Sequence, residues 1–474
     1  MNFNINQNKQ VFIHKAGYLF IARLLPILVL FVITVLFARK LSYNEYGTFQ
    51  SVWMYSNIIN VIITFGFTSI ILSTNESLLN SFIINNRQQI IFFYSLLTIL
   101  TLFVFYSYAR NLTLSTILLL IAFTLTQNII AIKEIYLIKY ERQQQLFYIN
   151  IFYTLFFLLW HFYILFQGYD LNKLIIGIII LSIIKIFAIR SHRTLLSNQN
   201  NLNLSHASFK NHWIFIGIND IIGVFSKWID KLFLLYLLTP SDFAVFFNGS
   251  FEIPLFGLLI TVAGNLLMVD ISKGLLSSEN VLKSFDTNYK LLSAIVFPIF
   301  FFLLFYNKEL FALLFNHKYD ASIPVFIISL FILPLRINNY GALLQCYSRG
   351  DLVMKGSILD ISIVIILMLA LYTDLSTKGV AVAVVFGTYA QIFYYLLSAS
   401  KAINVRFLAL FPLKYLSIYF FIILIIYTSF HFIYFGNDIY IRLLIGGSIT
   451  IFTIIAGLIK FNRNNIKNFN GNNS

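Results

Sequence analysis

The chain has 474 residues, of which 59% are hydrophobic and only 11% are charged, and its formal net charge is +15. A soluble domain carries about 45–50% apolar and about 25% charged residues, so this composition excludes a soluble globular protein. The net positive charge does not indicate a nucleic-acid partner, because basic loops are typical of membrane proteins and no soluble basic domain is present to hold one.

The apolar residues form long blocks, of which Tyr18–Ala38 is the first and Ile361–Tyr372 is a later example. A spanning helix needs about 20 apolar residues, whereas the strands of a membrane barrel have about 9–11. Because hydrocarbon offers no partner to the backbone, these blocks predict helices, and the first is too long for a signal peptide. Fourteen spans are predicted, at 14–38, 48–73, 89–108, 112–132, 146–166, 172–190, 212–238, 243–269, 291–315, 322–346, 352–373, 377–399, 408–430 and 440–460.

The basic residues are unevenly divided between the two sides of this predicted bundle. Of the 33 Lys and Arg residues, 21 fall in the N-terminal segment and every second loop after it, and eight fall in the opposite loops. Cytoplasmic loops carry an excess of Lys and Arg, so the bias predicts that both termini lie in the cytoplasm. It also supports an even number of spans.

The chain repeats a turn motif at an offset of 197 residues. "LSYNEYGTF", Leu41–Phe49, aligns with "LTPSDFAVF", Leu238–Phe246, and six predicted spans separate the two copies. An even number gives both copies the same orientation, which predicts a parallel repeat and two like-oriented lobes around a central cleft. The predicted domains are a six-helix lobe at 1–190, a cytoplasmic linker at 191–211, a second six-helix lobe at 212–400, two additional spans at 401–460 and a disordered tail at 461–474.

Charged residues inside predicted spans are costly in a bilayer, so each one needs a partner, water or a function. Arg23 lies in the first span, three residues before Pro26. In the seventh span, Asp220, Lys227 and Lys231 fall within a stripe about 40° wide at 100° per residue, and Asp230 stands beside it. We expect this stripe to line the cleft, and the alternative is a set of ion pairs that satisfy one another.

Three more ionisable residues fall within later spans: Glu252 beside Pro254, Arg336 near the end of the tenth span, and Asp360 in the eleventh. Glu252, Asp220, Asp230 and Asp360 are candidates for coupling to a proton or monovalent cation, or for pairing with the lysines. The lone histidines His161 and His431 are interpreted as hydrogen-bonded structural residues. No P-loop, metal-ligand cluster or nucleophile elbow is present, so the sequence predicts neither an enzyme nor a cofactor.

Both copies of the turn carry a resemblance to a known family. "ARKLSYNEYGTFQ" and "IDKLFLLYLLTPSDFAVF" resemble the corresponding turns of the O-antigen (Wzx-type) polysaccharide flippases, which belong to the multidrug/oligosaccharidyl-lipid/polysaccharide exporter superfamily. Gly47 keeps the family's glycine, while Ala244 departs from it in the second copy. The two-lobed pattern with extra C-terminal spans is also similar.

The resemblance implies an inner-membrane flippase for undecaprenyl-pyrophosphate-linked oligosaccharide, used in the synthesis of O-antigen or capsule. It implies contacts with membrane lipids and with polysaccharide polymerase machinery. A pyrophosphate needs cations in a medium of low dielectric constant, and the candidates within spans are Arg23, Lys227, Lys231 and Arg336.

Two other functions stay open. A drug or metabolite antiporter of the same superfamily would depend more on acidic residues, and ion-driven efflux of organic cations would reveal it. A polysaccharide polymerase or ligase would carry a large periplasmic loop, whereas the longest loop here, 191–211, lies on the predicted cytoplasmic side.

Overall fold

The structure is a computed structural model that describes residues 3–73, 76–108, 112–140, 142–189, 206–250, 257, 278–347, 349–432 and 438–471. Within these residues all regular secondary structure is helical, which confirms the predicted all-α class. Eight helices in this described part are long and apolar enough to cross a membrane, so the chain is a multi-pass membrane protein.

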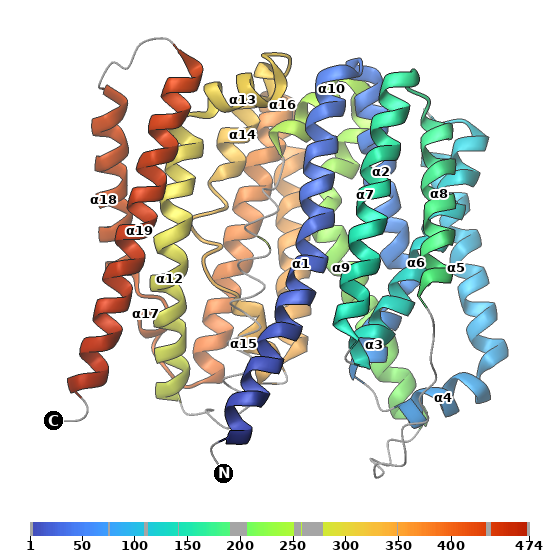
Figure 1. Ribbon diagram of the computed structural model, residues 1–474, viewed down its shortest axis with the longest axis horizontal. Helices are drawn as coiled ribbons and strands as arrows, with labels where there is room; N and C mark the ends of the chain where they lie inside the picture. The colour runs from blue at the N-terminus through green and yellow to red at the C-terminus, as the bar shows by residue number, and fades with distance from the viewer. Residues whose placement is uncertain are drawn as a thin grey trace. The chain divides into compact units, whose positions relative to one another are not determined.

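The chain divides into two compact units, and the first comprises Met1–Trp228 and Leu235–Ser241. Within it, α1 packs along α7, and α6 packs against α8, α2 and α3 (Figure 1). The Asn150 side-chain amide on α7 donates to the Ala22 carbonyl on α1 over 3.4 Å. Its helices are α1 (Phe3–Lys40), α2 (Tyr43–Thr64), α3 (Phe67–Ser73), α4 (Glu76–Asn85), α5 (Arg87–Tyr108), α6 (Leu114–Lys139), α7 (Gln143–Gln167), α8 (Leu171–Ala188) and most of α9 (His206–Leu237).

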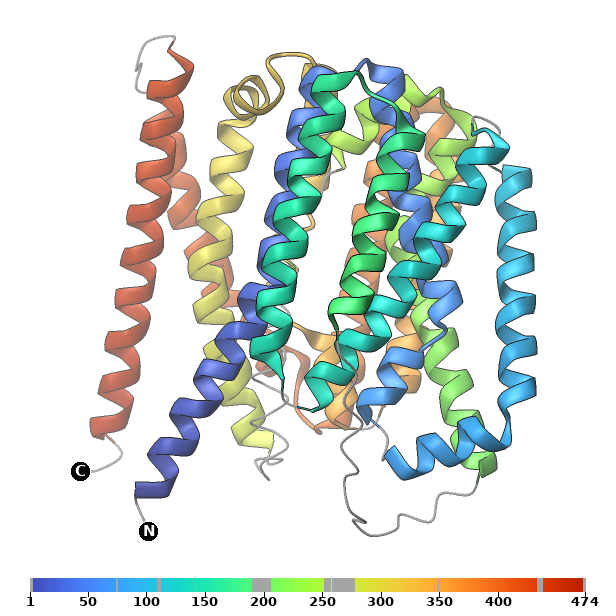
Figure 2. The same ribbon diagram turned by 45° about the vertical axis from the view of Figure 1, so that its right-hand side comes forward.

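The second unit comprises Ile229–Leu234 and Asp242–Ser474. In it, α12 packs against α18 and α19, and the short helices α14 and α15 pack against α16 (Figure 2). Its elements are α10 (Pro240–Gly249, which begins in the first unit), α12 (Ser278–Phe305), α13 (Asn307–Phe315), η1 (Asp320–Ser322), α14 (Ile323–Leu330), α15 (Tyr340–Cys346), α16 (Gly350–Ala402), α17 (Phe407–Leu410), α18 (Leu413–Phe432) and α19 (Ile439–Gly471).

The long helix α16 consists of two antiparallel arms. Ser376 has a φ of 52°, outside the helical region, and the chain turns back there. Across the turn, a side chain at Gly379 would lie 2.5 Å from the Leu371 carbonyl oxygen. The arms agree with the separate spans predicted at 352–373 and 377–399.

Three predicted spans are interrupted in the structure. The span predicted at 48–73 is divided into α2 and α3, because Phe65 and Gly66 both have positive φ values and end α2. The span at 322–346 is divided into α14 and α15 by residues 331–339, which include Pro334. The span at 291–315 is divided between α12 and α13 at Tyr306.

The domain limits expected from the sequence, with a linker at 191–211, stay predictions. In the structure, the division between the two compact units falls within α9. Of that linker, residues 191–205 lie outside the described part, and 206–211 form the start of α9. The tail expected to be disordered from residue 461 continues α19 as far as Gly471, since neither proline nor glycine interrupts 458–470.

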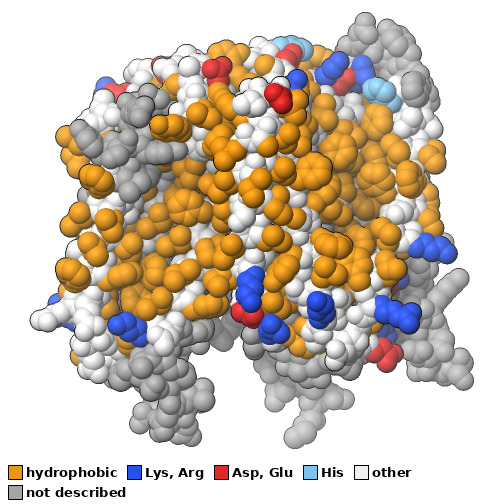
Figure 3. All heavy atoms as spheres, turned by 180° about the vertical axis from the view of Figure 1, so that it is seen from behind, with side chains coloured by type: hydrophobic (Ala, Val, Ile, Leu, Met, Phe, Trp, Pro, Cys, Tyr) orange, Lys and Arg blue, Asp and Glu red, His pale blue; other side chains and the backbone are white. Residues whose placement is uncertain are grey.

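Large apolar side chains are exposed along the helices, as lipid-facing helices require. Phe92, Phe103, Ile366 and Phe452 each have more than 60% of their surface exposed. On the face drawn in Figure 3, hydrophobic side chains cover the middle, and most charged side chains lie along the upper and lower edges. This distribution is typical of side chains in a bilayer.

Candidate functional site

The predicted charged residues of α9 do not all have the same surroundings. Lys227 is exposed, and its ammonium nitrogen lies 5.4 Å from the centre of the Trp228 ring. Asp220 is half-buried. Lys231 is buried, and its ammonium nitrogen lies 3.0 Å from Oδ2 of Asp230, which is only 4% exposed. Of the two lysines in the predicted stripe, Lys227 is therefore the one that presents its charge at the surface of its own unit.

The pairing of Lys231 follows from its long side chain. Neighbouring residues project about 100° apart on a helix, which is why the sequence placed Asp230 beside the stripe. Four methylene groups allow the ammonium to bend back to the preceding carboxylate. Since an unpaired charge is costly in a buried position, we expect Asp230 and Lys231 to stabilise each other and to have little net charge together.

Arg23 lies on the exposed face of α1, and within the described residues it forms neither an ion pair nor a hydrogen bond. The helix continues through Pro26 without a break. A proline cannot donate to the preceding turn, so the carbonyl oxygen of Ala22, four residues earlier, accepts from the Asn150 side chain instead. Arg23 is therefore adjacent to Ala22, whose carbonyl oxygen accepts its hydrogen bond from α7 and not from α1 itself.

Arg336 belongs to the irregular segment 331–339 between α14 and α15, and its side chain is half-buried. Asp360 is buried on the first arm of α16, directly opposite Gly387 on the second arm. A Cβ atom at Gly387 would lie 2.4 Å from the Val364 side chain and 2.7 Å from the Asp360 carboxylate, so glycine there lets the two arms pack closely. The candidate Glu252 lies outside the described residues.

The sequence analysis missed a polar network in the first unit. The Lys185 ammonium on α8 lies 2.6 Å from Oε1 of Glu134 on α6, and 4.3 Å from the centre of the Tyr153 ring on α7. Ser182 on α8 accepts from the Gln127 side chain over 2.8 Å. Lys185 lies five residues inside the predicted span 172–190, and that position is the sequence signal that could have indicated its burial.

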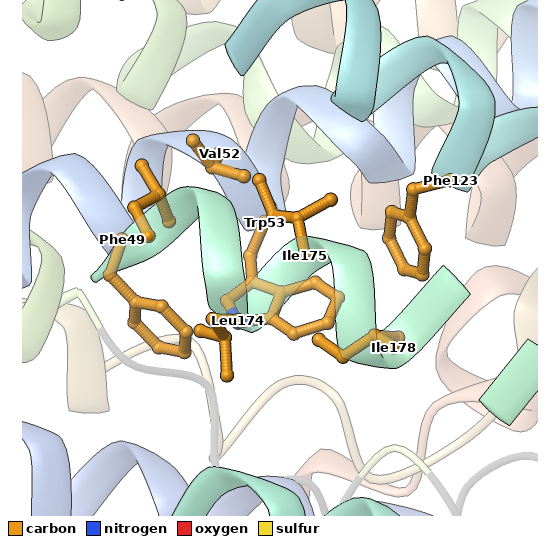
Figure 4. Close-up of a pocket in the computed structure, with 8 residues that line it drawn as sticks. Phe49, Val52, Trp53, Phe123, Leu174, Ile175 and Ile178 are labelled. Atoms are coloured by element: carbon orange, nitrogen blue, oxygen red, sulfur yellow. The ribbon is translucent and has the colours of Figure 1, made fainter. Parts of the chain in front are cut away.

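The Trp53 region forms an apolar pocket (Figure 4). Its lining side chains carry no charge, so it lacks the cations that a pyrophosphate needs. The nearby His161 is buried, and its Nδ1 lies 2.7 Å from the Phe157 carbonyl oxygen, which confirms the predicted structural hydrogen bond. The pocket residues are Phe49, Val52, Trp53, Phe123, Leu171, Leu174, Ile175 and Ile178.

The described residues contain no group of three or more His, Cys, Asp or Glu side chains that could hold a metal ion. The site candidates in this part of the chain are therefore single charges and pairs. Asp220 and Lys227 belong to the first unit, as does Arg23, whereas Asp230, Lys231, Arg336 and Asp360 belong to the second.

Comparison with protein-family models and with curated proteins gave no match. Among solved structures, the lipid II flippase MurJ in an inward closed conformation is similar over 96% of this chain and 100% of its own, with a TM-score of 0.67 and 16% identity. A multidrug resistance MATE family transporter of the MOP superfamily, in an inward-facing conformation, is similar over 81% of this chain and 98% of its own, with a TM-score of 0.56 and 12% identity. The chain thus has the fold of these transporters.

Proposed function

We propose that this chain is a flippase that moves an undecaprenyl-pyrophosphate-linked oligosaccharide across the inner membrane by alternating access, with both termini in the cytoplasm. The observation that carries the proposal is a set of basic side chains in a chain with a transporter fold, on segments that the sequence predicts to cross the membrane. Arg23 and Lys227 are exposed on their helices, and Arg336 lies at an interrupted helix. A pyrophosphate is an anion that such side chains can bind with charge-assisted hydrogen bonds.

The fold similarity to a lipid II flippase supports a lipid-linked substrate. Apolar side chains exposed on α5 and α16, such as Phe92 and Ile366, allow a polyprenyl tail to remain in the bilayer while the polar head is moved. In this proposal, the pyrophosphate head group of the substrate is bound by the side chains of Arg23, Lys227, Lys231 and Arg336. The product would pass to the polysaccharide polymerase machinery for assembly of O-antigen or capsule.

Movement against a gradient needs an energy source, and we propose coupling to a proton or a monovalent cation. Asp230 on α9 and Asp360 on α16 are buried carboxylates of the second unit, and Asp220 is half-buried in the first. Buried carboxylates of this kind mark ion pathways in membrane proteins. Glu252 is the fourth candidate for ion coupling, because the sequence places it within the eighth predicted span.

The proposed function is tested by reconstitution into liposomes that contain undecaprenyl-pyrophosphate-linked oligosaccharide. Access of a glycosidase or lectin to the sugar reports its transfer between leaflets. We expect the full-length protein to accelerate transfer, and Arg23→Ala and Lys227→Ala to slow it without loss of folded protein. Lys173→Ala is the control, because Lys173 is an exposed residue at the start of α8. No acceleration by the wild-type protein would contradict the proposal.

An ion-coupled antiporter for small organic cations is the second candidate. The similarity to a multidrug resistance MATE family transporter and the buried Asp230 and Asp360 favour it. In the same liposomes, ion-driven movement of ethidium without movement of the lipid-linked sugar would support the antiporter. Movement of the sugar alone would support the flippase.

A further inference from the structure

Residues 331–339, between α14 and α15, do not form the regular i to i−4 hydrogen bonds of an α-helix throughout. After α14, three successive N–H groups each donate to the carbonyl oxygen three residues earlier, over 2.9–3.2 Å; the donors are Phe331, Ile332 and Leu333. Such bonds are of the 3₁₀ type and make the last turn tighter than an α-helical one. The Phe331 carbonyl oxygen accepts from the Tyr389 hydroxyl over 2.6 Å. In the hydrocarbon region, irregular backbone is tolerated where protein covers it or where it lines a cavity, and such interruptions are typical of binding sites in transporters.

Asn338 lies at the end of this interruption and is only 5% exposed. Its Oδ1 accepts from the Asn339 backbone N–H over 2.9 Å. Its Nδ2 has no hydrogen-bond partner among the residues that the structure describes. A buried amide without a partner costs free energy, so each such group in a folded protein needs an explanation.

A second hydrogen-bond donor lies two residues later. The hydroxyl of Tyr289 donates to that of Tyr340 over 2.8 Å, and both side chains are at least 97% buried. The Tyr340 hydroxyl hydrogen then has no acceptor among the described residues. The ring of Tyr289 meets that of Phe411 edge-on at 5.7 Å, so apolar surface surrounds these polar groups.

Asn338 and Tyr340 thus provide two buried, neutral donors without acceptors among the described residues, and aromatic rings pack around the second. Such donors bind an acceptor oxygen, and the carbonyl oxygen of an amide is a stronger acceptor than a sugar hydroxyl because resonance with the nitrogen gives it more negative charge. We propose that the interrupted helix binds the sugar of the lipid-linked substrate through the carbonyl oxygen of an acetamido group. This inference rests on the proposed function and adds the class of sugar.

The donors are enclosed in this structure, so binding requires the segment between α14 and α15 to open. An interrupted helix can do so with little loss of backbone hydrogen bonding, because no backbone N–H of residues 337–339 donates to the backbone of the preceding turn. Arg336 lies within the same segment, two residues before Asn338. We therefore expect the pyrophosphate and its first sugar to be bound by adjacent parts of one element.

The test measures affinity of the purified full-length protein in lipid nanodiscs for three probes. These are undecaprenyl pyrophosphate, undecaprenyl-pyrophosphate-glucose and undecaprenyl-pyrophosphate-N-acetylglucosamine. We expect the acetamido sugar to bind the wild-type protein about three- to tenfold more tightly than glucose, since one neutral hydrogen bond has about that effect. Equal affinity of the wild-type protein for the two sugars would overturn the inference.

Asn338→Asp is the informative variant, because it keeps an oxygen for the Asn339 N–H and removes the amide donor. We expect it to lose the preference for the acetamido sugar, and Tyr340→Phe, a smaller change, to weaken it. The matched control is Asn307→Ala, since Asn307 is also buried but its amide already donates to the Leu304 carbonyl. Thermal unfolding of each variant verifies that it is folded.

The two hypotheses fail in different ways. If the wild-type protein binds none of the three probes, the proposed function fails. If it binds them with the acetamido preference and both folded variants retain that preference, the assignment of Asn338 and Tyr340 fails while the flippase proposal stands.

Discussion

The ammonium of Lys185 on α8 lies 2.6 Å from the carboxylate of Glu134 on α6, inside the first unit. The Lys185 side chain is only 8% exposed, and that of Glu134 is 25% exposed. The ring of Tyr153 on α7 adds a cation–π contact to the same ammonium. Three helices therefore meet at one ion pair.

We expect Lys185→Met to destabilise the protein by about 3 kcal/mol, because it leaves the Glu134 carboxylate partly buried without its partner. This value is at the lower end for buried pairs, since water still reaches part of Glu134. The double variant Lys185→Met with Glu134→Leu should recover most of the loss, since no charge is then left without a partner. Thermal unfolding in detergent measures the stability of the single and the double variant. Equal unfolding temperatures for the two variants would argue against a stabilising ion pair between Lys185 and Glu134.

Gly47 shows why one copy of the repeated turn needs glycine. A side chain there would lie 1.8 Å from the Pro240 carbonyl oxygen, well inside van der Waals contact. We expect Gly47→Ala to shift the backbone and to destabilise the first unit by about 1–3 kcal/mol, the usual range for overpacking. The yield of folded protein and its unfolding temperature are the measurements.

Gly223→Ala is the matched control for that substitution. Gly223 lies on α9, and a side chain there would meet nothing within 4 Å. Alanine is a better helix former than glycine, so this change should leave stability unaltered or raise it by up to about 1 kcal/mol. A similar loss from both substitutions would mean that glycine at 47 is not required by the contact with Pro240.

Much of the fold follows from apolar periodicity and turn chemistry. The motif at 41–49 begins α2, where Ser42 and Glu45 form a capping box through their side chains and backbone N–H groups. The interruptions at 65–66 and 331–339 were not predicted. Both lie inside uniformly apolar blocks, where composition cannot distinguish one helix from two half-helices; Gly66 and Pro334 were the available signals.

The charged residues were harder to interpret from the sequence. A helical projection gives the direction of each Cβ atom, but the final position of a lysine ammonium depends on several rotatable bonds. This is why Lys231 reaches Asp230, although the projection grouped it with Lys227. Asn338 carries no charge, and its burial depends on contacts within the second unit that no local pattern reveals.

We expect the Asp360 carboxylate to be needed for ion coupling and not for folding. Asp360→Asn keeps nearly the same volume beside Gly387 and removes the negative charge. We expect the variant to remain folded and to lose the dependence of transport on a proton or sodium gradient. Transport in liposomes with each gradient imposed in turn is the measurement. Unchanged gradient dependence in the variant would exclude Asp360 from coupling.

Lys227 and Lys231 should respond differently to the same substitution. Lys227 is exposed, so Lys227→Ala should leave stability nearly unchanged and lower the affinity for undecaprenyl pyrophosphate. Lys231→Ala should leave a buried Asp230 carboxylate without its partner and cost about 3–5 kcal/mol of stability. The combination of Lys231→Met and Asp230→Asn should restore most of that loss.

A lysine that binds the pyrophosphate can be distinguished from one that only pairs with Asp230 by measuring affinity for undecaprenyl pyrophosphate at low and high salt. Salt screening weakens the attraction between an exposed cation and an anion. The wild-type protein should lose affinity as salt rises, and the Lys227→Ala variant should lose less. The restored Lys231→Met and Asp230→Asn variant should show the wild-type salt dependence if Lys231 only balances Asp230. A flattened salt dependence in that folded variant would instead mean that Lys231 binds the pyrophosphate itself.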